Sequence, residues 1–369
     1  MNIPLVDLQA QYKTIKTDID AAIKQVVRKC DFILGDEVNE FENSFAKYIG
    51  VHYCIGVASG TDAIHLMLLA ADVKPGDEVI TQANTFIATV LPMMELGAKP
   101  VLVDVDEMTG AIDIDKVRKA ITKKTRAILP VHLFGRPAPM NELFRITNHE
   151  SRITVLEDAA QAHGSTINGK RAGSFGSMAA FSFYPGKNLG AYGDAGAITT
   201  NNKKLADMIR IVRNIGMREK YNHVVPGFNS RLDTIQAAIL SVKLKHLNDW
   251  NAKRDNIAKT FVRELSGVGD LVTPPLSTSD AKTNWHIFPI RTKKRDQLIK
   301  YLAEKGIHCG IHYPVPLHMT PALKSLGYKK GDFPISELRA ETMLSLPMYA
   351  ELTERQQAYI VATIKRFFR

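Results

Sequence analysis

Three short stretches of the sequence carry residues that could do chemistry. In the first, Ser59, Gly60 and Thr61 follow the apolar run HYCIGVA and precede a helical pattern. Glycine lets an anion approach the backbone, threonine offers a hydroxyl, and the first turn of a helix has free N–H groups. The stretch is therefore typical of an anion site, but serine and threonine are also ordinary helix caps. Taken alone, it leaves both interpretations open.

The second stretch is ITVLEDAAQAHGS, in which an apolar run ends at Glu157 and Asp158. A carboxylate that is buried at the end of a strand needs a partner. The cationic nitrogen of a ring would satisfy Asp158, and so would an arginine or the start of a helix. This stretch also leaves its alternatives open.

The third stretch is FSFYPGKNLGAYGDAG, which holds Lys187 among glycines and aromatic residues. A nucleoside triphosphate loop needs the pattern GxxxxGK[ST], but Phe181 stands at its first glycine and Asn188 follows the lysine. GxGxxG is not matched either, so both nucleotide motifs are excluded. A lysine in a desolvated, positively charged pocket can lose its proton and form a Schiff base. The alternative is a lysine on a surface loop.

Taken together, the three stretches predict a site for pyridoxal 5'-phosphate. This cofactor needs a cradle for its phosphate, an acid for its pyridinium nitrogen and a lysine that forms a Schiff base. All three stretches stand at the ends of predicted strands, and ligands of open α/β sheets bind outside the carboxyl ends of the strands.

The elements that must position these residues alternate between strands and helices. We expect helices over 61–73, 85–97 and 137–150, and strands over 52–59, 77–82, 99–106, 125–135, 153–160, 178–184 and 195–200. This alternation favours an α/β fold with a mostly parallel sheet that is covered on both faces. From Ser230 to about Leu265 the helical periodicity has few interruptions, which predicts a long connector helix. We therefore expect a large domain over 1–245, with an N-terminal arm, and a smaller C-terminal α/β domain over 246–369.

Composition narrows the class of protein. The 369 residues carry a net charge of +10. Three explanations of this charge are a surface that binds nucleic acid, a cleft that attracts an anionic substrate, and excess lysine on helix faces exposed to water. We favour lysine-rich helix faces and expect no nucleic-acid partner, because the sequence has no long basic run and no known nucleic-acid motif. The sequence also lacks an apolar run of membrane-spanning length, a secretory signal and a CxxC pair, so we expect a cytoplasmic protein with no metal site.

The motifs as a set resemble the DegT/StrS-type sugar aminotransferases. The resemblance rests on SGTDA, NTFIATV, EDAAQAHGS, FSFYPGKNLGAYGDAG and GFNSRLDTIQAAIL, and it runs from PLVDL near the start to SLPMY near the end. These enzymes use pyridoxal phosphate and have the fold-type I architecture of aspartate aminotransferase. The resemblance thus implies a large, mostly parallel sheet domain that binds the cofactor and a smaller C-terminal α/β domain.

The resemblance also implies roles for single residues. Lys187 would form the Schiff base and then move the proton, and Asp158 would pair with the pyridinium nitrogen. Gln161 would bind near the phenolic oxygen, and Phe86 would pack against the ring. Gly60, Thr61 and Ser182 would hold the phosphate. Asn229 matches an asparagine that reaches this phosphate from a neighbouring subunit, so a homodimer with shared active sites is expected.

The same resemblance implies a reaction. Some relatives have histidine in place of Lys187 and remove a hydroxyl group, so the lysine favours ping-pong amine transfer from L-glutamate. RNIGMREKYNHVVPGFNSRLD and IHYPVPLH are closer to members that aminate carbon 3 of a dTDP-linked 3-keto-6-deoxyhexose. The alternatives are a 4-aminotransferase that acts on a 4-keto sugar nucleotide and a regulator that binds the cofactor without turnover. The candidate substrate residues offer cations for a diphosphate and rings for a sugar face: Tyr184, His163, Lys220, Tyr221, His223, Arg231, His312 and Tyr313.

Overall fold

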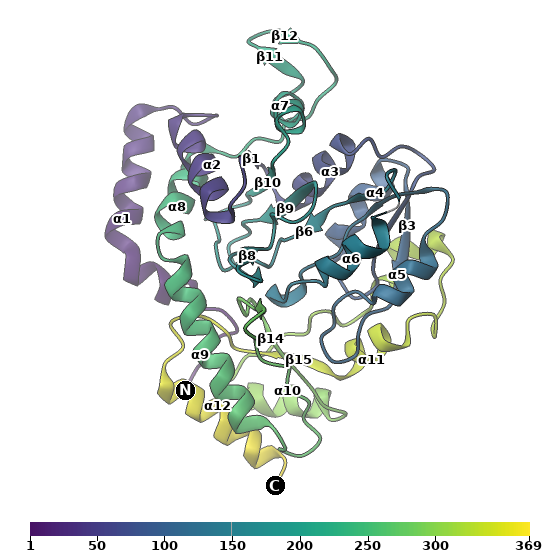
Figure 1. Cartoon of the computed structure of the whole chain (residues 1–369). Helices are drawn as coiled ribbons and strands as arrows, with labels where there is room; N and C mark the ends of the chain where they lie inside the picture. The colour runs from purple at the N-terminus through teal and green to yellow at the C-terminus, as the bar shows by residue number, and fades with distance from the viewer. Residues whose placement is uncertain (149) are drawn as a thin grey trace.

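A sheet with helices on both sides forms the centre of the computed structural model, which describes residues 1–148 and 150–369 (Figure 1). One half of the sheet has the order β1 (Tyr53–Val57), β10 (Gly196–Thr200), β9 (Met178–Ser182) and β6 (Glu157–Asp158). The other half has the order β3 (Lys99–Val103), β2 (Glu78–Gln82), β4 (Thr125–Ile128) and β5 (Thr154–Val155). Leu156 separates β5 from β6, and its N–H donates to the carbonyl of Ile128, so the two halves are continuous.

The pairing within the sheet is parallel except at β10. This strand is antiparallel to both β1 and β9, whereas β6 and β9 are parallel, and so are β2 and its neighbours β3 and β4. The expectation of a mostly parallel sheet is therefore confirmed. Because the parallel strands all end at one edge, the residues that follow them are brought together there.

Apolar side chains on both faces of the sheet explain why helices cover it. Successive residues of β1 enter different clusters: Ile55 packs with α3 (Gly60–Ala70) and α7 (Lys203–Val212), and Cys54 packs with α2 (Asp36–Ile49) and α8 (Thr234–Leu244). Side chains of a strand alternate between faces, so these clusters lie on opposite sides. Helices α5 (Ile114–Ala120) and α6 (Met140–Thr147) cover part of the other half of the sheet.

The expected helix over 85–97 is interrupted. A short 3₁₀ turn, Ile87–Thr89, precedes α4 (Leu91–Glu95), which has Pro92 in its first turn. Proline has no N–H to donate to the preceding turn, so it starts a helix rather than continuing one. The expected connector helix is also divided, into α8 and α9 (Leu247–Leu265), because α8 packs against α1 (Leu8–Lys29) and α2 whereas α9 packs against α12 (Glu354–Phe367).

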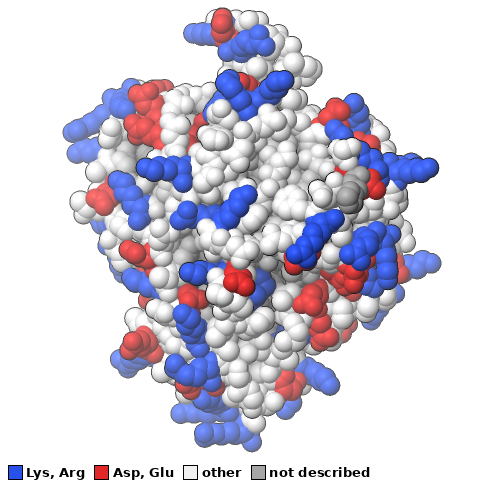
Figure 2. Space-filling view, viewed as in Figure 1, with Lys and Arg blue, Asp and Glu red and all other residues white. Residues whose placement is uncertain are grey.

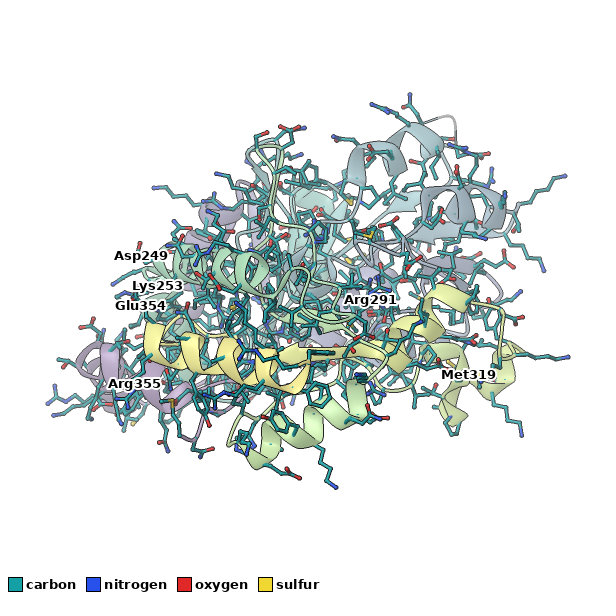
Figure 3. The ribbon with its side chains drawn as sticks, turned by 90° about the horizontal axis from the view of Figure 1, so that it is seen from below. Asp249, Lys253, Arg291, Met319, Glu354 and Arg355 are labelled. Atoms are coloured by element: carbon teal, nitrogen blue, oxygen red, sulfur yellow. The ribbon has the colours of Figure 1, made fainter. Side chains whose placement is uncertain are left out.

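The C-terminal part has its own apolar core. Strand β14 (Phe288–Arg291) pairs with β15 (Met343–Leu346), and α9, α10 (Arg295–Glu304) and α12 pack around Trp285 and Phe288. Figure 3 shows α12 alongside α9, with Glu354 near Lys253. Ile3 also enters this core and bridges to Ile307, so the N-terminal arm crosses from the large sheet. The domain division at residue 245 stays a prediction.

Smaller elements complete the described chain. A hairpin of β11 (Met217–Glu219) and β12 (Asn222–His223) projects beyond the body at the top of Figure 1. The other short elements are β7 (Thr166–Ile167), β8 (Lys170–Arg171), β13 (Ala281–Lys282) and α11 (Pro334–Thr342). None of the helices within the described residues is long and apolar enough to cross a membrane.

Candidate active site

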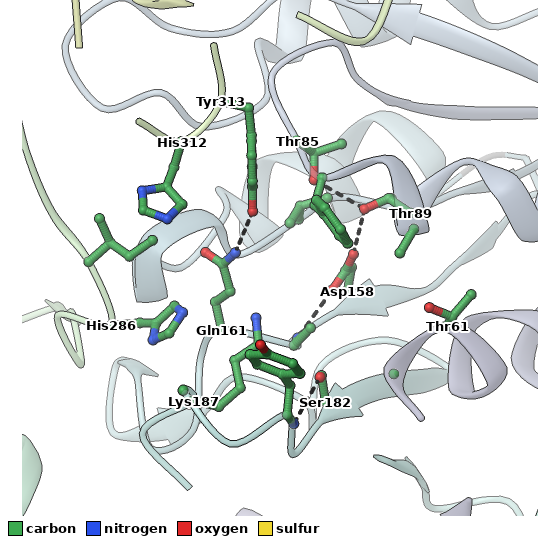
Figure 4. Close-up of a pocket in the computed structure, with 18 of the residues that line it drawn as sticks. Thr61, Thr85, Thr89, Asp158, Gln161, Ser182, Lys187, His286, His312 and Tyr313 are labelled. Atoms are coloured by element: carbon green, nitrogen blue, oxygen red, sulfur yellow. Dashed lines mark hydrogen bonds between the residues drawn. The ribbon is translucent and has the colours of Figure 1, made fainter. Parts of the chain in front are cut away.

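A cavity of about 450 Å³ lies at the edge of the sheet where the parallel strands end (Figure 4). Ser59 follows β1, Thr85 follows β2, and Asp158 and Ser182 end β6 and β9. All four line the cavity, which has the size of an ordinary cofactor site. Because β10 runs the opposite way, the residue before its start, Ala195, lies at the same edge.

The first turn of α3 forms an anion cradle beside Ser182. Ser59 caps the helix, with its Oγ accepting from the N–H of Asp62 at 3.1 Å. A Cβ on Gly60 would lie 2.6 Å from the Cβ of Ser182, so only glycine allows the helix start to come this close. Free N–H groups of the helix and the hydroxyls of Thr61 and Ser182 therefore meet at one place. The sequence predicted that Gly60, Thr61 and Ser182 bind a phosphate, and the structure brings these three residues together.

Asp158 lies in the cavity wall, 4% exposed. Its Oδ1 accepts from the N–H of Ala160 at 3.1 Å, and its Oδ2 accepts from Thr89 Oγ1 at 2.8 Å. Burial raises the pKa of Asp158, and these two hydrogen bonds and the charge of Lys187 oppose the rise. Asp158 forms no ion pair within the described residues. A buried carboxylate of this kind suits a cationic nitrogen on a ligand.

Glu157, the neighbouring acid, is used by the fold. Its carboxylate accepts hydrogen bonds from three N–H groups within 173–176, each at 2.7 Å. It also lies 2.9 Å from Nε2 of His132, whose Nδ1 accepts from the N–H of Ala138. The proton of His132 is therefore on Nε2 and is donated to Glu157. Glu157 thus fixes β6, and Asp158 is left free to face the cavity.

Lys187 follows β9 and lies in the same cavity wall. Burial lowers the pKa of its amine to about 8, although the carboxylate of Asp158 favours the charged form. About half of such amines are neutral near pH 8, which makes Lys187 a nucleophile under mild conditions. Its loop is held in place, because Lys243 Nζ donates to the carbonyl of Gly190 at 2.7 Å and Asn188 Nδ2 donates to the carbonyl of Asn284 at 2.9 Å.

Gln161 is oriented by two contacts. Its Oε1 accepts from the N–H of Phe134 at 2.6 Å, so its Nε2 is the group that points toward Tyr313, whose hydroxyl lies 3.2 Å away (Figure 4). Phe86 lies 5.4 Å from the ring of Tyr313 and is 52% exposed, a large exposed area for an aromatic residue in a cavity wall. The arrangement offers a donor and an aromatic face to a flat ligand.

Two histidines line the cavity near Lys187. His312 Nδ1 lies 2.9 Å from Ser345 Oγ, and burial lowers the pKa of His312 to about 4, with the charge of Lys187 adding to the effect. His286 lies 3.2 Å from Asn188 Oδ1, and burial, followed by the charge of Lys187, holds its pKa well below the usual value. Both rings are therefore neutral near pH 7, so the cavity holds few competing positive charges.

Several of the predicted substrate residues do not line this chain's cavity. His163 is fully buried, with its ring 5.5 and 5.6 Å from those of Phe181 and Phe183. Four more predicted substrate residues belong to the β11–β12 hairpin or follow it: Lys220, Tyr221, His223 and Arg231. Asn229, which was predicted to reach the phosphate of a neighbouring subunit, also follows the hairpin and does not line this chain's cavity. Tyr184, His312 and Tyr313 do line the cavity, as predicted.

Charges of both signs are mixed on the face of the molecule in Figure 2. On the face in Figure 2, acidic side chains are interspersed with the lysines and arginines, and basic residues also mark the hairpin tip at the top. We therefore see no continuous basic stripe on that face of the kind that tracks a nucleic-acid backbone.

Sequence reasoning missed four polar residues that line the cavity: Thr85, Thr89, Asp194 and His286. Thr85 and Thr89 stand four positions apart within a predicted helix, which was a usable signal that both hydroxyls share one face. Their Oγ1 atoms are 3.1 Å apart. His286 gave no comparable signal, because it reaches the cavity from the C-terminal part.

Comparisons with known proteins agree with this geometry. The DegT/DnrJ/EryC1/StrS aminotransferase family matches residues 13–365. A protein of Geobacillus stearothermophilus named as a pleiotropic regulatory protein is 48% identical, covering 100% of this chain and 99% of its own. A dTDP-3-amino-3,6-dideoxy-alpha-D-galactopyranose transaminase of Aneurinibacillus thermoaerophilus is 42% identical, covering 99% of each chain. The crystal structure of S. venezuelae DesV in complex with a ketimine intermediate has a TM-score of 0.97 at 41% identity, covering 100% of this chain and 99% of DesV. These likenesses confirm the expected fold type.

Proposed function

The chain belongs to the DegT/DnrJ/EryC1/StrS aminotransferase family, and we propose that it moves an amino group from L-glutamate to carbon 3 of a dTDP-linked 3-keto-6-deoxyhexose. It is a sugar aminotransferase that depends on pyridoxal phosphate. The proposed product is a dTDP-3-amino-3,6-dideoxyhexose. The observation that carries the proposal is the pairing, in one cavity, of Asp158 with Lys187, whose pKa is lowered to about 8.

The residues of the cavity fit the cofactor at each of its polar groups. We propose that Gly60, Thr61 and Ser182 hold the phosphate, because free N–H groups and two hydroxyls meet there. Asp158 would accept the hydrogen bond of the pyridinium nitrogen, and Gln161 Nε2 would donate to the phenolic oxygen. When bound, pyridoxal phosphate supplies an aldehyde that takes up an amino group and a ring that delocalises the electrons left by a departing proton.

The side chains around the cofactor site divide the work of proton transfer. Lys187 Nζ would take a proton from the carbon of the amino donor and deliver a proton to the carbon of the sugar. The carboxylate of Asp158 would hold the proton on the ring nitrogen. His286 and His312 remain neutral near pH 7, so neither adds a positive charge that would lower the basicity of Lys187 further. The order is ping-pong, with the donor half-reaction first.

We also propose a homodimer with shared sites. Among the residues that the structure describes, the phosphate cradle has hydroxyls but no amide or cationic side chain. Asn229 is exposed, and the nearby Tyr221 and Phe228 are 81% and 43% exposed. In a two-fold dimer, the protruding hairpin of each subunit can reach the cavity of the other subunit. Lys220, Tyr221, His223, Asn229 and Arg231 would then act in the partner's site.

The choice of carbon 3 is the finer part of the proposal. It is supported by the A. thermoaerophilus relative, whose name describes a 3-amino-sugar transaminase. Tyr184, which is 60% exposed at the cavity, together with His312 and Tyr313 would form the wall near the sugar. The alternative is transfer to carbon 4 of a 4-keto sugar nucleotide.

A regulator without turnover is the second candidate, and one observation favours it. The G. stearothermophilus relative is named as a regulatory protein and is 48% identical. Such a protein would use the same cavity and would bind the cofactor, but it would not release an aminated sugar.

The test combines cofactor mapping with product analysis. Borohydride should trap the cofactor on Lys187, and the purified protein should then be given L-glutamate with a 3-keto or a 4-keto dTDP-deoxyhexose, the aminated carbon being assigned by NMR. We expect amine at carbon 3 and none from Lys187→Arg. Amine at carbon 4 would support the alternative, and trapping without any aminated sugar would support the regulator.

A further inference from the structure

A second, smaller cavity is lined by three arginines. Arg136, Arg291 and Arg339 surround a space of about 20 Å³, which we call the arginine cavity. Arg136 comes from the large sheet domain, Arg291 ends β14 and Arg339 belongs to α11. Arg291, which is labelled in Figure 3, pairs with Met343, the first residue of β15 directly after α11. The cavity therefore lies between the large sheet and the C-terminal part.

The positive charge around the arginine cavity is only partly balanced. Arg291 lies 3.5 Å from a carboxylate oxygen of Glu107, whose side chain is 55% exposed. Arg136 and Arg339 form no ion pair within the described residues, and they donate to the backbone carbonyls of Pro275 and Glu107 instead. The carboxylates of Asp106 and Glu107 supply two negative charges for these three guanidinium groups, which leaves one positive charge that a negative partner would balance.

Burial makes the positive charges of Arg339 and Arg136 more costly. Arg339 is 3% exposed, and burial lowers its pKa to about 10, with the charge of Arg291 adding to the effect. Burial also lowers the pKa of Arg136. The carboxylate of Asp106 opposes both shifts, and its Oδ1 also accepts from the N–H and the hydroxyl of Thr109 at 2.7 and 2.6 Å.

Two donors in the wall of the arginine cavity have no partner within the described residues. They are Nε of Arg339 and Oγ1 of Thr283, and Thr283 is 6% exposed. Leaving a buried donor unsatisfied costs about 1–3 kcal/mol. A small anion in the cavity would balance positive charge that remains on the guanidinium groups.

We propose that the arginine cavity binds one small inorganic anion of the size of chloride. A space of about 20 Å³ has room for roughly one water-sized particle, which excludes a sugar phosphate or a nucleotide. The anion would join the loop at 106–110 and Arg136 to the C-terminal residues Arg291 and Arg339. Ile287 lines both this cavity and the candidate active site, so the anion would also support the wall between them.

The test uses the full chain loaded with pyridoxal phosphate. Thermal unfolding is followed in sodium chloride and in sodium gluconate at equal ionic strength, because gluconate is too large for the cavity. We expect Tm to rise with chloride by about 2 °C for each tenfold increase above the dissociation constant, and not with gluconate. Crystals in bromide should show anomalous density among the three guanidinium groups.

Variants separate the cavity from general salt effects. Arg136→Gln should lose the chloride dependence of Tm, whereas Arg118→Gln should keep it, because Arg118 is an exposed arginine paired with Asp115. Arg339→Met should behave like Arg136→Gln, and the bromide measurement on the unmodified protein decides the matter if either variant fails to fold. Equal Tm values in chloride and gluconate, or bromide density absent from the arginine cavity, would overturn the proposal.

Discussion

The hydrogen bond from Thr89 to Asp158 should control how tightly the protein holds its cofactor. Thr89→Val keeps the shape of the side chain but removes the Oγ1 donor that lies 2.8 Å from Asp158 Oδ2. Thr89 is 2% exposed, so water has little access to replace the lost donor. A hydrogen bond to a charged group is worth about 1.5–3 kcal/mol, which corresponds to about 1–2 pKa units.

The sign of the effect follows from the state of Asp158. Burial already raises its pKa, and Thr89 opposes that rise, so the variant should raise the pKa further. A protonated Asp158 cannot pair with a pyridinium nitrogen, and binding must first remove its proton. At pH values below the pKa of Asp158, the dissociation constant for pyridoxal phosphate should therefore increase by about 10- to 100-fold. The loss of cofactor affinity in the variant should grow as the pH falls through the raised pKa of Asp158, and it should shrink at higher pH.

The assay is a titration of the apoprotein with pyridoxal phosphate at several pH values, followed by absorbance. Thr81→Val is the matched control, because Thr81 is a fully buried threonine whose Oγ1 donates to the carbonyl of Leu129 at 2.7 Å. It should lower the stability of the fold but leave the pH dependence of binding unchanged. Thr85→Val, one hydroxyl further from Asp158, should have a smaller effect than Thr89→Val. If Thr89→Val bound the cofactor like the unmodified protein at every pH, the reasoning would be refuted.

Three further predictions concern the cradle, the lysine and the dimer. Gly60→Ala places a Cβ 2.6 Å from the Cβ of Ser182, so one backbone must move, and a titration should show cofactor affinity lower by about tenfold or more. The rate at which the apoprotein reacts with pyridoxal phosphate should rise with pH and level off above about 8, because the neutral amine of Lys187 is the reactive form. A rate that still rises steeply at pH 10 would indicate that the pKa of Lys187 is not lowered. Mixed dimers of inactive Lys187→Ala and Asn229→Ala subunits should recover roughly a quarter of the activity if sites are shared, whereas no recovery would argue for sites built from one chain.

Much of the candidate site was predictable because it depends on strand ends. Asp158 and Ser182 end two parallel strands, and Gly60 opens the helix after a third. A parallel sheet brings such positions to one edge whatever the details of packing. The prediction that Lys187 joins them therefore needed only the strand pattern and the type of residue.

Other features were decided by contacts between distant parts of the chain. Periodicity predicted one helix over 85–97, but a 3₁₀ turn that ends at Thr89 precedes the helix that contains Pro92, and Thr89 donates to Asp158. His286 enters the cavity from the C-terminal part, so local sequence could not place it there. The hairpin residues looked like substrate contacts, but within one chain they lie outside the cavity.

By itself, the sequence determined the parallel sheet, the order of the chemical groups along it and the kind of cofactor that they suit. Apolar periodicity and the type of residue at each strand end are local properties, which a single chain displays before it folds. The tertiary structure decided the state of those groups. The lowered pKa of Lys187 and the three facing arginines depend on which surfaces exclude water from one another, and burial of this kind is settled only by packing between residues far apart in the chain.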